Sequence, residues 1–222
     1  FFWFLLFCCG VGVNQMADTT NIAIVGSGGT GKTCIVTRFV TEKYSEGYEP
    51  TIETSYSKVF NYEGAEYNLE IIDTSGREEY GQMRDSALRR ADGFIVVYSV
   101  ESLMSFDELD SHLSAIAKAK DNDKFPMVLI GNKADVDESK FQAKEEVTEK
   151  KAISLGCPWL EVSARKNEQI DDAFFLLMQQ IYHPNNFHRK KKKKKSEKKS
   201  KDKKGKDSKK DKKKDKKKDK KK

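Results

Sequence analysis

Short runs of apolar residues alternate along the chain with longer segments whose apolar residues recur at helical spacing. The runs predict six strands, at residues 22–26, 55–62, 66–73, 94–100, 126–131 and 159–164. The longer segments predict five helices, at about residues 32–42, 82–91, 104–120, 141–155 and 168–182. The last of these places Ile170, Ala173, Phe174, Leu177 and Ile181 on one stripe, which is typical of a helix packed on a sheet.

Four of the predicted strands are almost entirely apolar at their centres, as strands covered on both faces should be. Residues 55–62 instead alternate polar and apolar side chains, which is the pattern of an edge strand. The alternation of strands and helices favours an α/β fold, with a six-stranded, mainly parallel sheet flanked by about five helices. Ligands of such sheets bind at the carboxyl ends of the strands, so the candidate chemistry should lie there.

The first predicted strand leads into GSGGTGKT at residues 26–33, which matches the P-loop pattern G-x4-GK[ST]. Its glycines allow backbone amides to turn inward, and the positive end of the following helix adds to their attraction for phosphate. Lys32 supplies a cation for the terminal phosphates, and the Thr33 hydroxyl can ligate Mg²⁺. The segment predicts a P-loop NTPase that binds a nucleoside triphosphate, but it does not indicate the base.

Two further segments follow predicted strands, GNKAD at 131–135 and SAR at 163–165, and should lie at the same edge of the sheet. Asp135 is placed where a carboxylate could accept hydrogen bonds from guanine N1–H and the exocyclic amine. Adenine lacks this pair of donors, so it would leave the carboxylate unpaired. Each segment alone is common in ordinary loops. Both together, in this order and after a P-loop, indicate guanine.

On these residues the chain resembles the Ras family of small GTPases over about residues 20–183. The segments GSGGTGKT, YEPTIETSY, DTSG, NKAD and SAR occur in the family's order and at its spacings. The resemblance implies a molecular switch that binds GTP or GDP with Mg²⁺ and hydrolyses GTP. It implies a nucleotide site formed by Gly26, Ser27, Gly28, Gly29, Thr30, Gly31, Lys32, Thr33, Cys34, Tyr44, Tyr48, Thr51, Gly76, Asn132, Lys133, Asp135, Ser163, Ala164 and Arg165.

Within this site the resemblance assigns recognition of the base mainly to the segments at 131–135 and 163–165. Asn132 and Asp135 would read guanine, Lys133 would pack over the base, and Ala164 would contribute a backbone amide. Tyr44 would flank the ring where the family usually has an aromatic residue.

The resemblance assigns the phosphate-dependent switch to two loops. Thr51 would reach Mg²⁺ only when a γ-phosphate is present, Thr33 would bind the metal directly, and Asp73 would hold it through water. The Gly76 amide would bond the γ-phosphate. Loss of that phosphate would release both loops, an order-to-disorder switch.

Arg77 stands where the family usually has a glutamine after DT[AS]G. Glutamine both donates to and accepts from the attacking water, whereas arginine has five donors, no acceptor and a permanent charge. With Lys32, Thr51 and Gly76 forming the rest of the implied catalytic set, we expect slow hydrolysis and a poor response to activators that rely on the glutamine. Two alternatives stay open: an activator could supply its own water-positioning residue, or Arg77 could stabilise transition-state charge.

The resemblance also implies partners: an exchange factor, a GTPase-activating protein and effectors that contact residues 48–56 and 76–84 of a monomer. Thr54 stands where the family commonly has an acidic residue, so an effector that meets that carboxylate with a cation would lose a hydrogen bond of about 1.5–3 kcal/mol. Two other function classes remain: a non-hydrolysing scaffold held in one state by Arg77, and an adenylate-binding P-loop kinase, for which the sequence shows neither a lid nor an acceptor site.

The net charge of +7 averages two very different parts of the chain. Residues 189–222 hold 24 of the 42 Lys and Arg and 6 of the 35 Asp and Glu, so this tail carries +18 and the remainder −11. A tail of this composition is expected to be disordered. It could bind an anionic membrane surface, contributing about 1 kcal/mol per basic residue before screening, or bind nucleic acid or direct nuclear import. A solvated tail without such a role is the third alternative.

The sequence therefore predicts a doubtful apolar extension at 1–15, a GTPase domain at 16–183 and a Lys-rich tail at 184–222. The opening FFWFLLFCCGVGV is short for a transmembrane helix, which needs about 20 residues. It is either translated upstream sequence or an anchor with Cys8 and Cys9 as palmitoylation sites. No cysteine follows Cys157, so we expect no prenyl anchor. The cysteine pattern favours a reducing compartment, and we expect the cytoplasmic face of the plasma membrane, with the nucleus second.

Overall fold

The computed structural model describes residues 19–44, 53–76 and 81–184, with the backbone alone for 81–84. Its single sheet has six strands in the order β2-β3-β1-β4-β5-β6. The strands are β1 (Thr20–Val25), β2 (Glu53–Tyr62), β3 (Ala65–Thr74), β4 (Gly93–Ser99), β5 (Met127–Asn132) and β6 (Trp159–Glu161). All neighbours pair in parallel except β2 and β3. This confirms the mainly parallel sheet, with residues 53–62 at its edge.

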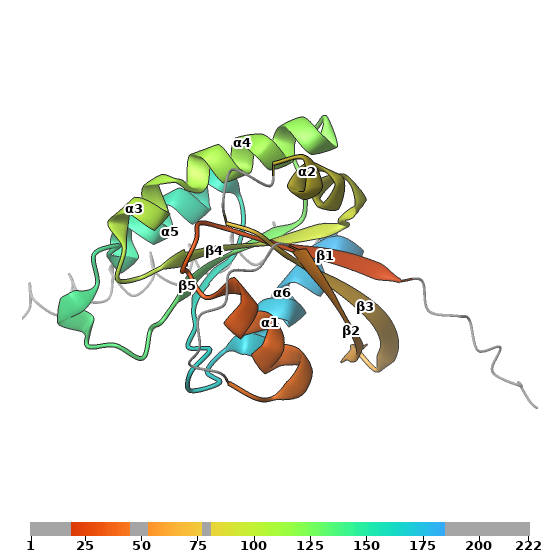
Figure 1. The fold of residues 1–222 in the computed structure, drawn as a ribbon, viewed down its shortest axis with the longest axis horizontal. Coiled ribbons are helices and arrows are strands. Elements are labelled where there is room, and N and C mark those ends of the chain that lie inside the picture. The colour runs from red at the N-terminus through yellow and green to blue at the C-terminus, as the bar shows by residue number, and fades with distance from the viewer. Residues whose placement is uncertain (1–18, 45–52, 77–80, 185–222) are drawn as a thin grey trace, which may run out of the picture.

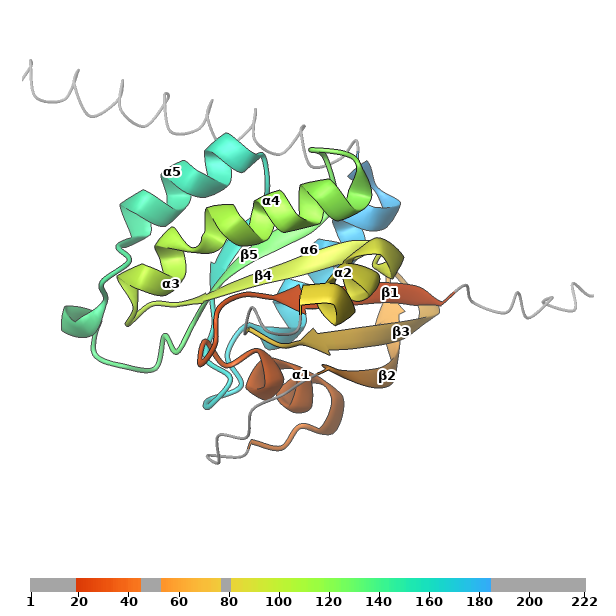
Figure 2. The ribbon, with the colours of Figure 1, turned by 45° about the horizontal axis from the view of Figure 1, so that its top comes forward.

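Helices cover both faces of the sheet (Figures 1 and 2). They are α1 (Lys32–Thr41), α2 (Gly81–Arg90), α3 (Leu103–Asp107), α4 (Leu109–Lys120), α5 (Glu145–Leu155) and α6 (Ile170–Tyr182), with a short 3₁₀ helix η2 at Glu138–Lys140. Helices α1 and α6 pack on one face, and α2, α3, α4 and α5 cover the other. The alternation of βα units forces this arrangement, because each crossover helix must return over one face.

Side chains of the central strands alternate between two cores, as the two-residue period of a strand requires. Ile22 and Ile24 of β1 lie in the core under α1 and α6, whereas Ala23 and Val25 lie in the core under α2 and α4. The first core is closed by α6, where Ile170, Ala173, Phe174 and Leu177 of the predicted apolar stripe are buried and Ile181 is partly buried. The rings of Phe39 in α1 and Phe174 in α6 stack there with centroids 3.6 Å apart.

Three predicted elements differ from the structure in their extent. The helix predicted at 104–120 is divided into α3 and α4 at Glu108, whose amide bonds the carbonyls of both Met104 and Phe106. The helix predicted at 141–155 begins at Glu145, after η2. The strand predicted at 159–164 ends at Glu161, since Ser163 leaves the sheet to form a bridge with Glu168.

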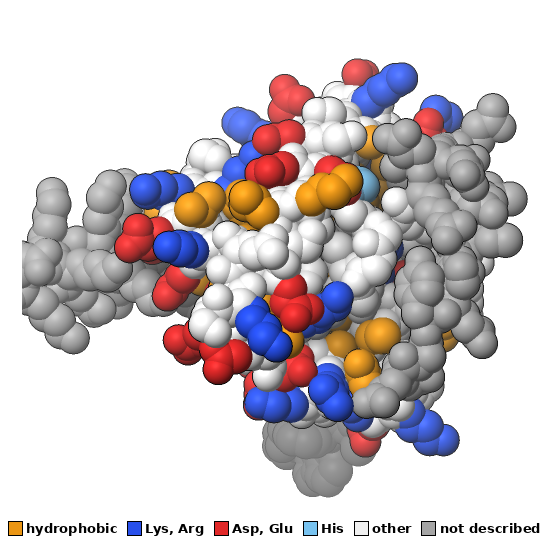
Figure 3. All heavy atoms as spheres, turned by 60° about the vertical axis from the view of Figure 1, so that its left-hand side comes forward, with side chains coloured by type: hydrophobic (Ala, Val, Ile, Leu, Met, Phe, Trp, Pro, Cys, Tyr) orange, Lys and Arg blue, Asp and Glu red, His pale blue; other side chains and the backbone are white. Residues whose placement is uncertain are grey.

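Apolar side chains also reach the surface of the helices. Leu103 and Met104 of α3 and Val147 and Ile153 of α5 are exposed. On the face in Figure 3, hydrophobic side chains stand in small groups among acidic and basic ones, so neither charge sign dominates that face. No helix in the described ranges is both long and apolar enough to span a bilayer.

The carboxyl ends of the parallel strands converge at one edge of the sheet. The loop after β1 leads into α1, β3 ends next to Asp73, and β5 ends at Asn132. The loop after β6 returns to the same edge, because the Ala164 amide bonds the Asn132 side chain. The sheet therefore brings together four segments that are up to 139 residues apart, from residue 26 to residue 165.

Candidate nucleotide-binding site

The loop between β1 and α1 is held in shape by its own side chains. The Lys32 ammonium donates to the carbonyls of Gly26 at 2.8 Å and Ser27 at 2.9 Å. The Thr30 hydroxyl donates to the Ser27 carbonyl at 2.9 Å. Gly31 has a φ of 88°, and a Cβ at this position would overlap the side-chain amide of Asn132. The loop therefore requires glycine there, both for its backbone conformation and for the contact with β5.

Lys32 is a buried cation, with 6% of its surface exposed. Burial lowers the pKa of Lys32 to about 8, and the nearby Asp73 carboxylate acts in the opposite direction. A buried ammonium costs free energy unless it is paired. Phosphate oxygens at the start of α1 would supply that pairing and would also meet the positive end of the helix.

Thr33 and Asp73 form the second charged element of the site. The Thr33 hydroxyl donates to one oxygen of the Asp73 carboxylate at 2.6 Å. Asp73 is fully buried, and its other oxygen has no hydrogen-bond partner among the described residues. Burial raises the pKa of Asp73, while the Thr33 hydrogen bond and the Lys32 charge lower it.

This pair fits a magnesium ion. A hydroxyl and a buried carboxylate with an unsatisfied oxygen are the hard oxygen ligands that Mg²⁺ prefers. The described part of the chain contains no group of three or more His, Cys, Asp or Glu that could hold a metal ion by itself. Mg²⁺ commonly binds through one or two protein oxygens together with water and substrate phosphates, so two ligands suffice here.

Gly76 packs directly on the phosphate loop. A Cβ added at Gly76 would overlap the Gly28 amide nitrogen and lie within 2.7 Å of the Lys32 ammonium. A glycine is therefore required for this approach. The backbone of Gly76 is placed beside the loop, where the γ-phosphate contact was predicted.

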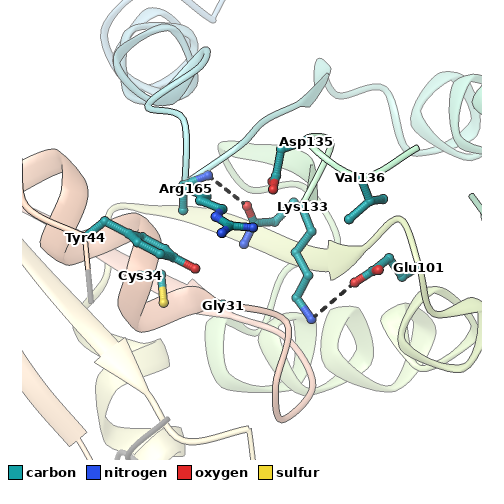
Figure 4. A pocket seen from close by; sticks show the side chains of 10 residues that line it. Gly31, Cys34, Tyr44, Glu101, Lys133, Asp135, Val136 and Arg165 are labelled. Carbon is teal, nitrogen blue, oxygen red and sulfur yellow. Dashed lines mark hydrogen bonds and ion pairs between the residues drawn. The ribbon is translucent and has the colours of Figure 1, made fainter. Parts of the chain in front are cut away.

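A pocket opens next to the phosphate loop, between α1 and the ends of β5 and β6 (Figure 4). Its lining comes from five separate segments of the chain, which meet at the carboxyl ends of the parallel strands. The lining residues are Gly31, Cys34, Tyr44, Glu101, Asn132, Lys133, Asp135, Val136, Ala164 and Arg165. The phosphate loop and the predicted base-reading residues thus border one cavity.

Asn132 joins the two sides of this pocket. Its side-chain NH₂ donates to the Thr30 carbonyl at 2.8 Å, and its side-chain oxygen accepts from the Ala164 amide at 3.2 Å. Asn132 is 2% exposed. Asn132 therefore fixes the separation between the phosphate loop and the segment at 163–165, a role that the sequence did not indicate.

Asp135 is oriented by a neighbouring hydroxyl. Ser163 donates to one oxygen of the Asp135 carboxylate at 2.8 Å, and the Ser163 oxygen accepts from the Lys166 amide at 3.0 Å. This places an acceptor at the rim of the pocket in a fixed orientation. The geometry suits recognition of a base that presents two adjacent donors.

Tyr44 and Lys133 lie on opposite sides of the pocket in Figure 4. The Lys133 ammonium forms an ion pair with the Glu101 carboxylate at 3.8 Å. Both side chains are more than a third exposed, so the pair orients Lys133 more than it stabilises the fold. Glu101 was not predicted as a site residue, although its position just after β4, at the same edge of the sheet, could have indicated it.

Arg38 is the second functional residue that the sequence did not indicate. It lies in the last turn of α1 and donates to the carbonyls of Ala164 at 2.9 Å and Arg165 at 2.8 Å. A third donor bonds the Glu42 carbonyl at the end of α1, and the guanidinium lies 5.6 Å from the Tyr44 ring centroid. Arg38 therefore ties the 163–165 segment and Tyr44 to α1. A single arginine in a helix has no sequence pattern that predicts these contacts.

The predicted site residues that the structure describes gather around this edge. Cys34 lines the pocket beside the loop, and burial raises the pKa of its thiol. Ser27 belongs to the phosphate loop, but its hydroxyl bonds away from the pocket, to Glu108. Tyr48, Thr51 and Arg77 lie outside the described residues, so their predicted roles stay predictions.

The fold and the site together define a P-loop nucleotide-binding protein. The Ras family model matches residues 21–183. A Ras-like protein from Dictyostelium discoideum, rasC, is 37% identical over 166 residues, which cover 75% of this chain and 88% of the relative. A Ras-like protein from Laccaria bicolor is 36% identical over 160 residues, covering 72% of this chain and 76% of that protein. The chain belongs to the Ras family, whose members are GTP-binding switches.

Replacement of Arg38 by alanine should accelerate nucleotide release. The change removes two hydrogen bonds that hold the 163–165 segment against α1 and the contact of the guanidinium with the Tyr44 ring, so we expect bound fluorescent GDP to dissociate about tenfold faster. Arg38→Lys keeps the charge but cannot span the same carbonyls, and it should recover only part of the loss. A dissociation rate for Arg38→Ala equal to that of the unchanged protein, with the fold intact by circular dichroism, would show that these contacts do not support the site.

Proposed function

We propose that this protein is a guanine-nucleotide switch that binds GTP and GDP with Mg²⁺ and hydrolyses GTP slowly. The observation that carries this proposal is the common pocket: the oriented Asp135 carboxylate and the phosphate loop border the same cavity. A guanosine nucleotide is a ligand that would use both at once. Its base would meet Asp135, and its phosphates would meet Lys32 and the loop amides.

The protein's own residues divide the work of binding. Asp135 accepts from guanine N1–H and the exocyclic amine, and Tyr44 and Lys133 enclose the base. The loop from Gly26 to Thr33 surrounds the phosphates with amides and the Lys32 charge. Asn132 keeps the two regions at a fixed separation, so a ligand must match both.

Thr33 and Asp73 would hold the magnesium ion, with Thr51 as the further ligand that the family pattern assigns. When bound, the ion supplies positive charge that neutralises the phosphate oxygens. The buried Asp73 oxygen without a hydrogen-bond partner among the described residues supports this assignment. The Gly76 backbone, packed on the loop, would bond the γ-phosphate from the other side.

Arg77 limits the rate at which the protein hydrolyses its bound GTP. An arginine has no acceptor with which to hold the attacking water, so the water would be positioned less well than by a glutamine. Hydrolysis in this class depends mainly on positioning and on charge stabilisation. A slow intrinsic reaction leaves the protein bound to GTP for longer after each exchange.

Arg77→Gln should raise the rate of GTP hydrolysis by about tenfold to a hundredfold, because glutamine can both donate to and accept from water. The measurement is single-turnover hydrolysis of bound GTP by the purified protein. Arg89→Gln is the matched control, since Arg89 is exposed on α2 and the same change there should have little effect. If Arg77→Gln hydrolyses no faster than the unchanged protein, Arg77 is not the cause of slow turnover.

Arg77 also favours a second function, a scaffold that keeps GTP bound and does not hydrolyse it. Both functions require GTP binding, so phosphate release separates them. Release from the unchanged protein, alone or with a cellular extract that contains activators, identifies a switch. Retention of GTP in both conditions identifies a scaffold.

Effectors of this protein are expected to differ from those that recognise an acidic residue at position 54. Thr54 is exposed on the edge strand β2, and the neighbouring Glu53 forms an ion pair with Arg90 at 3.8 Å. An effector cation would find no carboxylate at Thr54 and would lose about 1.5–3 kcal/mol there. Effectors that meet a hydroxyl at this position fit the surface better.

The Lys-rich tail at 189–222 is proposed to bring the protein to an anionic membrane surface on the cytoplasmic side. We expect the full chain to bind vesicles that contain phosphatidylserine but not neutral phosphatidylcholine vesicles, and to leave the former at high salt. Tighter binding to RNA or DNA than to the anionic vesicles in the same buffer would contradict the membrane assignment and favour the nucleus.

A further inference from the structure

Ser27 differs from the rest of the phosphate loop in the direction of its side chain. It is 7% exposed and does not line the nucleotide pocket. Its hydroxyl donates to a carboxylate oxygen of Glu108, and the ring nitrogen Nε2 of His112 lies 3.3 Å from the same hydroxyl. A side chain of the loop is thus bound to the helical layer behind the site.

Glu108 is held firmly on its own side of this contact. It joins α3 to α4, where its amide bonds the carbonyls of Met104 and Phe106. Its carbonyl accepts from the amides of Ser111 at 3.1 Å and His112 at 3.3 Å. The interruption that divides the predicted helix 104–120 therefore lies at the residue that reaches the phosphate loop.

Ser27 is tied on its other side to the groups expected at the phosphates. Its carbonyl accepts from the Lys32 ammonium and from the Thr30 hydroxyl, each at 2.9 Å. A shift of Ser27 toward or away from α4 would displace the acceptor that Lys32 uses. The hydroxyl contact and the carbonyl contacts therefore fix one residue from two directions.

We propose that Glu108 is a positioning residue for the nucleotide: through the Ser27 hydroxyl it holds the phosphate loop in its binding conformation. His112, 8% exposed, lies against the pair and shields it from water. A hydrogen bond to a carboxylate is stronger than one between neutral groups. Because this pair is partly buried, water cannot easily replace the bond when one partner is removed. This inference rests on the proposed nucleotide-binding function, whose ligand it helps to retain.

The test is the dissociation rate of fluorescent GDP from the full-length protein with magnesium present. Ser27→Ala removes the donor and Glu108→Ala removes the acceptor, so each should accelerate dissociation by about tenfold. Asp107→Ala is the matched control, because Asp107 is the adjacent carboxylate and is exposed. It should stay within about twofold of the unchanged protein, as expected for a surface substitution.

Two further variants separate positioning from general loss of stability. Glu108→Gln keeps an acceptor oxygen, so it should restore most of the slow dissociation that Glu108→Ala loses. The double variant Ser27→Ala/Glu108→Ala should dissociate no faster than the faster single variant, because both changes break the same bond. Thermal unfolding of each variant shows whether the fold itself has changed.

The proposal is overturned if Ser27→Ala and Glu108→Ala release GDP at the rate of Asp107→Ala. It is also overturned if their effects multiply in the double variant, or if Glu108→Gln is as fast as Glu108→Ala. Failure of the unchanged protein to bind GDP at all would instead contradict the proposed function. The two failures are therefore distinguishable in one set of measurements.

Discussion

The side-chain amide of Asn132 is the contact on which the rest of the site depends. Its nitrogen bonds the Thr30 carbonyl of the phosphate loop, and its oxygen bonds the Ala164 amide of the loop after β6. These two segments are distant in sequence, since Thr30 and Ala164 lie at opposite ends of the domain. This buried amide sets the distance between the region proposed to bind phosphate and the region proposed to bind the base.

The sheet brings the groups of this contact together, and two charged side chains are buried beside it. Parallel strands bring their carboxyl ends to one edge, so β1, β3 and β5 deliver the loop, Asp73 and Asn132 to the same place. Lys32 and Asp73 are buried there. Burial lowers the pKa of Lys32 and raises the pKa of Asp73, so it favours the neutral form of each. Charges that are costly to bury are retained where a ligand of complementary charge can pair with them. The proposed nucleotide and its magnesium ion provide that complement.

Much of the fold could be predicted because it depends on local patterns. The apolar run at 94–100 and the stripe on the last helix reflect side-chain periods that the chain carries without tertiary information. The phosphate loop was predicted for the same reason, since its glycines, Lys32 and Thr33 are contiguous. The division at Glu108 was not predicted, because it depends on a hydrogen-bond arrangement that residue types do not specify.

The missed parts of the site are contacts between distant segments. Arg38 bonds carbonyls 126 and 127 residues further along the chain, and no spacing in the sequence encodes that distance. Ser163 and Asp135 were both predicted in the site, but the hydrogen bond that orients the carboxylate emerges only when the ends of β5 and β6 are adjacent. Sequence patterns predicted the groups that are proposed to carry the chemistry, whereas packing determined which residues hold them in place.

The most direct test of this account is competition of GDP and ADP for the nucleotide-free protein with magnesium present. The two ligands share their phosphates and sugar, so the difference between them measures recognition of the base alone. A site with an oriented carboxylate should favour GDP over ADP by roughly 10⁴-fold, because adenine has no pair of donors for the Asp135 carboxylate. Equal binding of GDP and ADP, or binding of neither, would contradict the assignment of Asp135 and the phosphate loop to one guanine-nucleotide site.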